Sequence, residues 1–370
     1  MIYFDSGATT FQKPPEVYAA VRKAMKTCAS VGRSGHRPAM EAARQVYECR
    51  RKAAELFDAE PEQAAFTFNA THGLNIAISS LVSEGDRVVV SGFEHNAVMR
   101  PLHARSAEIL TAGTRLFDPA DTLVEFQKAL KQKPAAAVCT HCSNVFGYIL
   151  PVEEIAELCR QYRVPLIIDA AQSAGVLPLS LRKTGAAFIA MPGHKGLYGP
   201  QGTGILLCRD GGKPLLFGGT GSNSESLDMP DFLPDRLEAG THNVWGLAGL
   251  NAGLGFVKRK TPEKILSHEQ QLRKGMEKEL QTIPGLDLFS GKAQSGVLSF
   301  RAEGTDCEEI ADGLGRRGIA VRAGLHCAPQ AHRSAGTLKT GTVRVSFSAF
   351  NTREEVSIFT SECKKLLTKS

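Results

Sequence analysis

Short apolar segments alternate with helical patterns from about residue 60 to residue 250, and this alternation constrains the fold most. Strands that run parallel need long crossover connections, which are usually helices. The alternation therefore predicts an α/β layer built on a mainly parallel sheet. The expected strands are 65–68, 87–91, 135–140, 166–169, 188–191 and 204–208, with helices at 73–81, 121–130 and 152–162.

The last two of these strands are an exception, because only a short glycine-rich stretch separates them. A crossover helix does not fit there, so we expect that pair to be antiparallel. Regular patterns are lost between residues 211 and 238, which is typical of a functional loop or an interface segment. A helical pattern resumes near Trp245, and the C-terminal region alternates again as α+β, with helices at 262–280 and 307–317 and strands at 296–300 and 343–347.

The length of 370 residues exceeds the size at which a single core usually stops growing, so two domains are expected. With 42% hydrophobic and 22% charged residues, the composition is that of a globular protein. Apolar runs stay far below the length of a membrane span, and the first residues lack a secretion pattern. We therefore expect a cytoplasmic protein with no membrane role.

The net charge of +6 comes from basic residues that are dispersed among acidic ones. Such a pattern favours solvated helix faces over a nucleic-acid-binding patch. Nine cysteines at irregular spacing indicate reduced core residues and no disulfide framework. Cys139 and Cys142 form a C-x-x-C pair, but no second such pair exists, so we expect no metal site.

Lys195 lies just past the strand 188–191, with Gly193 and Gly196 close by. A lysine there could reach a cofactor and act as a Schiff-base nucleophile, provided that burial or a neighbouring cation lowers its pKa. On the local sequence alone, an ordinary surface lysine is the alternative.

Asp169 ends the fully apolar strand 166–169, and ligands bind at the carboxyl ends of such strands. A carboxylate there could pair with a pyridinium nitrogen and keep that ring protonated. Gln172, three residues later, could donate to a ring hydroxyl. For Asp169 the capping of a helix is an equally supported alternative.

The segment 66–75 has the order strand, turn, helix start, and Thr71 lies in its turn. Free backbone N–H groups and the Thr71 hydroxyl could hold a phosphate there, although helix capping by Thr71 is the alternative. The segment matches neither of the common nucleotide-binding motifs. His95, which follows the strand 87–91, could stack on a cofactor ring or lie at the surface.

Cys327 follows a glycine-containing turn and stands next to a histidine, which suits a thiolate nucleophile, whereas a structural role is the alternative. Arg344 lies within the apolar strand 343–347. A guanidinium in such a strand needs a partner, commonly a carboxylate, which could belong to a substrate or to a structural Asp or Glu.

Together, and in this order, these elements resemble the class V aminotransferase family of fold type I pyridoxal 5′-phosphate (PLP) enzymes. They are most similar to its cysteine desulfurase and selenocysteine lyase group. The similarity extends from Tyr3 to Thr352. It implies an α/β fold type I transferase with a mainly parallel large domain and a smaller α+β C-terminal domain. The expected parts are an N-terminal segment near the active site (1–15), the PLP-binding domain (16–250) and the small domain (251–370).

By position, the resemblance implies that Lys195 carries PLP as a Schiff base and that Asp169 faces the pyridine nitrogen. Gln172 would contact the ring oxygen, and His95 would stack on the ring as a catalytic residue. The phosphate would be bound by Thr71, His72 and His194, together with Thr241 from the neighbouring subunit of a homodimer. The expected substrate-binding residues are Asn144, Arg322 and Arg344, with Arg344 on the α-carboxylate.

The implied reaction converts L-cysteine to L-alanine and leaves the sulfur as a persulfide on Cys327, from which a sulfur-acceptor protein could take it. Alternatives are a selenocysteine lyase acting on L-selenocysteine, another class V aminotransferase or β-lyase that does not use Cys327, and a sulfur carrier that has lost PLP. Two positions depart from the family pattern. Pro192 stands where Ser or Thr is frequent, and Leu325 replaces the first of two histidines before the cysteine.

Overall fold

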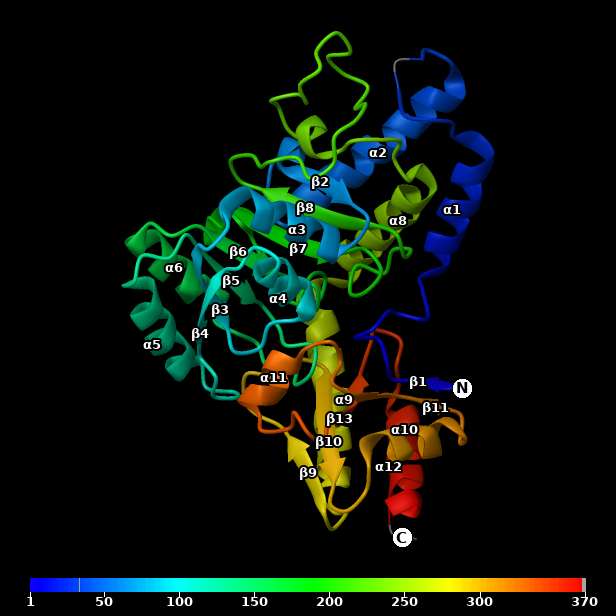
Figure 1. Ribbon diagram of the computed structural model, residues 1–370. Helices are drawn as coiled ribbons and strands as arrows, with labels where there is room; N and C mark the ends of the chain where they lie inside the picture. The colour runs from blue at the N-terminus through cyan, green and yellow to red at the C-terminus, as the bar shows by residue number, and fades with distance from the viewer. Residues whose placement is uncertain (33, 368–370) are drawn as a thin grey trace.

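The computed structural model describes residues 1–32 and 34–367, and a seven-stranded sheet forms the centre of its larger part (Figure 1). The strand order is β2-β8-β7-β6-β5-β3-β4. The strands from β7 to β4 are mutually parallel, whereas β8 runs antiparallel to both β7 and β2. The strands span Ala64–Thr67 (β2), Arg87–Ser91 (β3), Glu108–Ala112 (β4), Ala136–Thr140 (β5), Leu166–Asp169 (β6), Phe188–Pro192 (β7) and Gly204–Cys208 (β8).

Helices cover both faces of this sheet, and successive strand residues point to opposite faces. On β3, Val88 and Val90 pack into the core beneath α3 and α4, while Val89 belongs to the core on the other face, with residues of α2, α5, α6 and α8. The helices of this part span Pro15–Thr27 (α1), Arg37–Leu56 (α2), Ala70–Leu81 (α3), Asn96–His103 (α4), Pro119–Leu130 (α5), Val152–Tyr162 (α6), Leu181–Thr184 (α7) and Val244–Lys260 (α8).

The smaller part is built on a four-stranded antiparallel sheet of order β12-β13-β10-β9, with a core of its own (Figure 1). A short parallel pair, β1 with β11, ties the N-terminus to it. The elements are β1 (Ile2–Tyr3), α9 (Pro262–Leu280), β9 (Leu286–Phe289), β10 (Val297–Ala302), α10 (Cys307–Gly315), β11 (Ile319–Ala320), β12 (Arg322–Gly324), α11 (Pro329–Ser334), β13 (Thr342–Ser346) and α12 (Arg353–Leu367).

The predicted alternation is confirmed, including the antiparallel pairing of the strands 188–191 and 204–208. Several elements were not predicted, among them the half-exposed edge strand β4 and the helices α1 and α2. The segment 211–238 contains a single 3₁₀ turn, Asp235–Leu237, as its irregular composition indicates. The expected domain boundary after residue 250 falls inside α8, and the division itself remains a prediction. Among residues 1–32 and 34–367, no helix is long and apolar enough to cross a membrane.

Candidate active site

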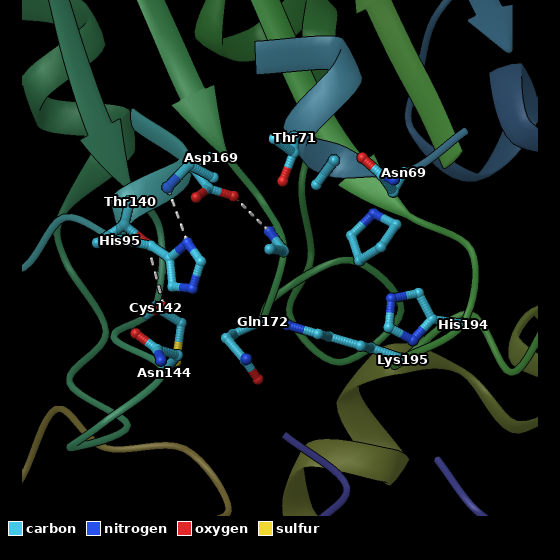
Figure 2. A pocket seen from close by; sticks show the side chains of 14 residues that line it. Asn69, Thr71, His95, Thr140, Cys142, Asn144, Asp169, Gln172, His194 and Lys195 are labelled. Atoms are coloured by element: carbon cyan, nitrogen blue, oxygen red, sulfur yellow. Dashed lines mark hydrogen bonds between the residues drawn. The ribbon is translucent and has the colours of Figure 1, made fainter. Parts of the chain in front are cut away.

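A cavity lies at the carboxyl ends of the parallel strands, where most of the predicted cofactor residues meet (Figure 2). Strands of one direction bring their following loops to the same edge of the sheet, which makes that edge a natural ligand site. Residues after β2, β3, β5, β6 and β7 all contribute. The lining consists of Asn69, Ala70, Thr71, His95, Ala97, Thr140, Cys142, Asn144, Asp169, Ala171, Gln172, Pro192, His194 and Lys195.

Lys195 extends from the turn after β7 into this cavity, toward Gln172 (Figure 2). Among the residues that the structure describes, none forms a hydrogen bond or ion pair with its Nζ atom. Burial lowers the pKa of Lys195 to about 8, and the positive charge of Arg344 acts in the same direction, against the opposing effect of Asp169. A substantial share of the amine is thus neutral near physiological pH, as a nucleophilic lysine requires.

Asp169 is the last residue of β6 and is 2% exposed. Its Oδ1 accepts a hydrogen bond from the Ala171 backbone N–H at 2.9 Å, within a turn that does not continue as a helix. The alternative that Asp169 caps a helix is therefore wrong. Burial raises the pKa of this carboxyl, while the Ala171 hydrogen bond and Lys195 oppose the rise. A cationic ring nitrogen would stabilise its charged form in the same way.

Gln172 lies across the cavity from Asp169, in the turn that follows β6 (Figure 2). Its Nε2 donates to the Gly7 carbonyl at 2.8 Å, so the N-terminal segment fixes its side chain. The prediction of a contact with a cofactor ring oxygen needs this amide to share or exchange that bond.

Helix α3 begins at the cavity, with Asn69 as its cap. Asn69 Oδ1 accepts from the His72 backbone N–H at 3.0 Å, so Thr71 lies inside the first turn and does not cap the helix. This frees the Thr71 hydroxyl, whose side chain points into the cavity (Figure 2). Free N–H groups and the helix dipole make such an end favourable for an anion such as a phosphate.

His72 and Thr241, two of the predicted phosphate ligands, do not line the cavity that contains Lys195. The His72 ring stacks on Phe68 with centroids 4.6 Å apart, and both predicted ligands line a neighbouring cavity. Within one chain the structure therefore does not bring them to Lys195.

His95 and His194 both line the cavity, and burial lowers the pKa of each to about 4, with the charge of Lys195 acting in the same direction. His95 caps α4, because its Nδ1 accepts from the Ala97 backbone N–H at 3.0 Å. The ring proton of His95 is therefore on Nε2. The His194 Nδ1 lies 3.0 Å from the Thr9 hydroxyl. Both rings are neutral at physiological pH, so they act through stacking and hydrogen bonds.

Cys327 is exposed and lies in a groove that adjoins the cavity. The two hollows share Thr71, His95 and Ala97, so Cys327 and Lys195 stand on either side of a common wall. Two hydrogen bonds from the segments after β3 and β5 hold the backbone of the cysteine loop. Asn144 Nδ2 donates to the His326 carbonyl at 2.7 Å, and the Asn96 backbone N–H donates to the Cys327 carbonyl at 2.8 Å.

The backbone of this loop is unusual, because His326 and Cys327 have φ angles of 50° and 56°. Few residues other than glycine adopt this left-handed region, and such positions cluster at functional sites. The turn is closed by the Ala328 backbone N–H, which donates to the Leu325 carbonyl at 2.9 Å.

Arg322 and Arg344 are paired across β12 and β13, and neither lines the cavity. Arg344 is 1% exposed, forms an ion pair with Asp5 and donates to the Asn144 carbonyl at 2.9 Å. A structural carboxylate is thus the partner that the structure shows, and the predicted substrate contacts of both arginines remain predictions.

Besides three alanines, the lining residues that were not predicted are Asn69, Thr140 and Cys142. Asn69 carried a usable signal, since an asparagine before a helical pattern is a common cap. Cys142 donates to the Ser295 hydroxyl at 3.4 Å, and burial raises its pKa to about 12. Over residues 1–32 and 34–367, no group of His, Cys, Asp or Glu is arranged to hold a metal ion.

Comparison with known proteins gives consistent results. The family model Aminotransferase class-V matches residues 2–359. A probable cysteine desulfurase of Methanothermobacter thermautotrophicus is 32% identical, over 96% of this chain and 92% of the relative. Another from Xylella fastidiosa is 33% identical, over 99% and 91%. The apo structure of a cysteine desulfurase from Thermococcus onnurineus NA1 has a TM-score of 0.93 and 30% identity, covering 100% of this chain and 95% of that one.

Proposed function

The chain belongs to the class-V aminotransferase family, and we propose that it is a PLP-dependent cysteine desulfurase that forms L-alanine from L-cysteine. One observation carries this choice within the family. The cavity that contains Lys195 and Asp169 shares a wall with the groove that contains the exposed thiol of Cys327. An aminotransferase has no need of a thiol at that place.

The residues of the cavity fit PLP. The buried Asp169 carboxylate suits a protonated ring nitrogen, and the start of α3 at Thr71 suits a phosphate. Lys195 offers an amine that has no hydrogen-bond partner among the described residues. Pro192 leaves the phosphate without one hydroxyl donor that relatives often have. When bound, PLP would supply an electron sink that stabilises negative charge on the substrate's Cα.

The chain itself would supply binding, orientation and proton transfer. Lys195, with its pKa lowered to about 8, would hold and move the proton of the substrate's Cα. We propose that Arg344 binds the α-carboxylate, as a buried guanidinium can, and that Asn144 and Arg322 complete the substrate site. The neutral His95 ring would pack against the cofactor ring and donate from Nε2.

Cys327 would receive the sulfur. As a thiolate, Cys327 would attack the sulfur of the substrate, so that an S–S bond forms while the substrate's Cβ–S bond breaks. The Cβ atom keeps the electron pair of the broken bond and gains a proton, which gives alanine and a persulfide on Cys327. The exposure of this thiol supports a later transfer of the sulfur to an acceptor protein.

A homodimer would complete the phosphate site, because Thr241 is exposed and lies away from the cavity within one chain. His72 would approach the phosphate only from the neighbouring cavity that it shares with Thr241. A cytoplasmic location is part of the same proposal.

The test supplies L-cysteine and L-selenocysteine separately to the holoenzyme and measures alanine together with sulfide or selenide. We expect alanine from L-cysteine in a 1:1 ratio with sulfide once a reductant is added. Alanine from L-selenocysteine alone would instead identify a lyase for that amino acid. Turnover of alanine to pyruvate that depends on an added α-keto acid would identify an aminotransferase.

A further inference from the structure

The N-terminal strap, defined as residues 3–10, connects the two halves of the candidate site. Gly7 accepts from Gln172 Nε2 through its carbonyl and donates to the Ser346 hydroxyl at 2.7 Å through its N–H. Its lack of a side chain permits a close approach, since a Cβ atom there would lie 3.1 Å from Arg344 Cζ. In Figure 1 this segment leads from β1, on the smaller part, to α1, which packs on α8 of the larger part.

Asp5, within this strap, is the carboxylate that faces Arg344. The Arg344 Nη2 contacts Asp5 Oδ1, and Nη1 donates to the Asn144 carbonyl. Nε is buried and has no hydrogen-bond partner among the described residues. The guanidinium therefore keeps donors free although it is almost completely buried.

A second buried ion pair, in which both carboxylate oxygens bind the guanidinium, serves as a comparison. Arg50 and Glu238 are joined by two parallel hydrogen bonds, Nη1 to Oε1 and Nη2 to Oε2, each 2.8 Å long. Both of these side chains are shielded, with 9% and 4% exposed, whereas Asp5 is 19% exposed. In the Arg50 pair both terminal nitrogens of the guanidinium bind the carboxylate, whereas Asp5 contacts only Nη2 of Arg344 and leaves this guanidinium partly available.

The Asp5–Arg344 pair also lies close enough to the cavity to influence it. The positive charge of Arg344 lowers the pKa of Lys195, and the negative charge of Asp5 raises it. Asn144, whose carbonyl binds Arg344, is itself part of the cavity wall. Both charges therefore act on groups inside the cavity that an incoming amino acid would enter.

We propose that Asp5 is a positioning residue that sets the affinity of the α-carboxylate subsite by acting as an internal counter-ion of Arg344. In the free enzyme its carboxylate offsets the buried positive charge, and an incoming α-carboxylate has to share or replace that contact. Substrate and product carry the same carboxylate, so Asp5 weakens the binding of both and speeds the release of alanine. This inference rests on the proposed role of Arg344 in substrate binding.

The test measures binding of L-alanine and of L-alaninamide to the holoenzyme by titration calorimetry, in a buffer without carboxylates. In Asp5→Asn the buried guanidinium lacks a counter-ion until a ligand provides one. The dissociation constant of L-alanine is therefore expected to fall about tenfold, while that of L-alaninamide changes by less than about twofold. The KM for L-cysteine is expected to fall more than kcat.

Three further variants make the test specific. Asp5→Glu keeps the charge and is expected to retain the wild-type preference between the two ligands. Asp5→Ser removes the charge with a smaller side chain and serves if Asp5→Asn does not fold. Asp287→Asn makes the same substitution in an exposed ion pair with Arg301, on the same sheet, and is expected to change neither constant.

The proposal is overturned if Asp5→Asn and Asp5→Ser bind L-alanine as weakly as the wild type or more weakly. It is also overturned if their affinity for L-alaninamide rises as much as their affinity for L-alanine, or if neither the wild type nor the variants bind L-alanine. Alanine and sulfide formation from L-cysteine are measured in parallel. If the Asp5 variants bind L-alanine more tightly but the wild-type protein does not desulfurate L-cysteine, the proposed function is contradicted and the role of Asp5 is retained.

Discussion

The cavity around Lys195 and the loop around Cys327 are held in different ways. Asp169 ends the buried strand β6, and Lys195 lies in the turn three residues after the buried strand β7, which pairs with β6 in the same sheet. Cys327 belongs to an exposed loop with a left-handed backbone, and contacts from Asn144 and Asn96, each more than 180 residues away in the chain, hold it. The comparison teaches that cofactor chemistry and sulfur transfer depend on separate supports and should be separable by mutation.

The largest effect on catalysis is expected from a substitution in the cavity around Lys195, where the sheet positions the residues. Asp169→Asn keeps the size of the side chain but removes the charge that would stabilise a protonated ring nitrogen. We expect kcat for alanine formation to fall by about 10²–10³-fold, while PLP still binds through Lys195. Steady-state kinetics and the absorbance of the holoenzyme check this. Asp169→Glu serves as the control that keeps the charge, and full activity of Asp169→Asn would break the assignment.

A stability measurement on the cofactor-free protein probes the same region. Below pH 8 the amine of Lys195 is charged in both the folded and the unfolded chain, and folding has to bury that charge. Above pH 8 the folded amine loses its proton while the unfolded one keeps it up to its usual pKa of 10.5, so the free energy of unfolding rises with pH.

Replacement of Lys195 by Met removes this effect. We expect Lys195→Met to be more stable than wild type at pH 7, by up to about 3 kcal/mol, and the gain to shrink as pH rises from 8 toward 10.5. Denaturant unfolding at several pH values measures the difference. Lys183→Met, at an exposed position, is the control and should show no such trend. A stability gain of Lys195→Met that increases with pH would contradict a lowered pKa of Lys195.

The loop side is probed by Asn144→Ala, which removes the 2.7 Å hydrogen bond to the His326 carbonyl. A less well-held thiol, together with the loss of the amide from the proposed substrate site, should reduce alanine formation from L-cysteine about tenfold, and the absorbance of bound PLP should not change. The backbone carbonyl that binds Arg344 is retained in this variant. An altered cofactor spectrum would show that the two regions are not separable.

The smallest effect is expected for the second thiol, Cys142, which lines the cavity but is buried with a pKa raised to about 12. A protonated thiol is a poor nucleophile, so Cys142→Ser should change kcat by no more than about twofold. Kinetics with L-cysteine test this. A large loss would assign a reactive role to the buried thiol.

The sheet side was also the more predictable one from sequence. The meeting of Lys195 and Asp169 in one cavity could be predicted because local hydrophobic patterns define β6 and β7, and parallel strands bring their ends together, whereas the roles of both residues remain predictions. Asn69 was missed because the helix was expected to begin three residues later. The partners of Arg344 and Cys327 could not be predicted, since their contacts to Asp5, Asn144 and Asn96 join distant segments and depend on the packing of the smaller part.

The most direct test of the account is to identify the cysteine that receives sulfur. The holoenzyme is exposed to L-cysteine without a reductant, and its peptides are analysed by mass spectrometry for one added sulfur atom. The account predicts the persulfide on Cys327 alone, and none in Cys327→Ser although that variant retains bound PLP. A persulfide on Cys142, or persulfide formation that persists in Cys327→Ser, would contradict it.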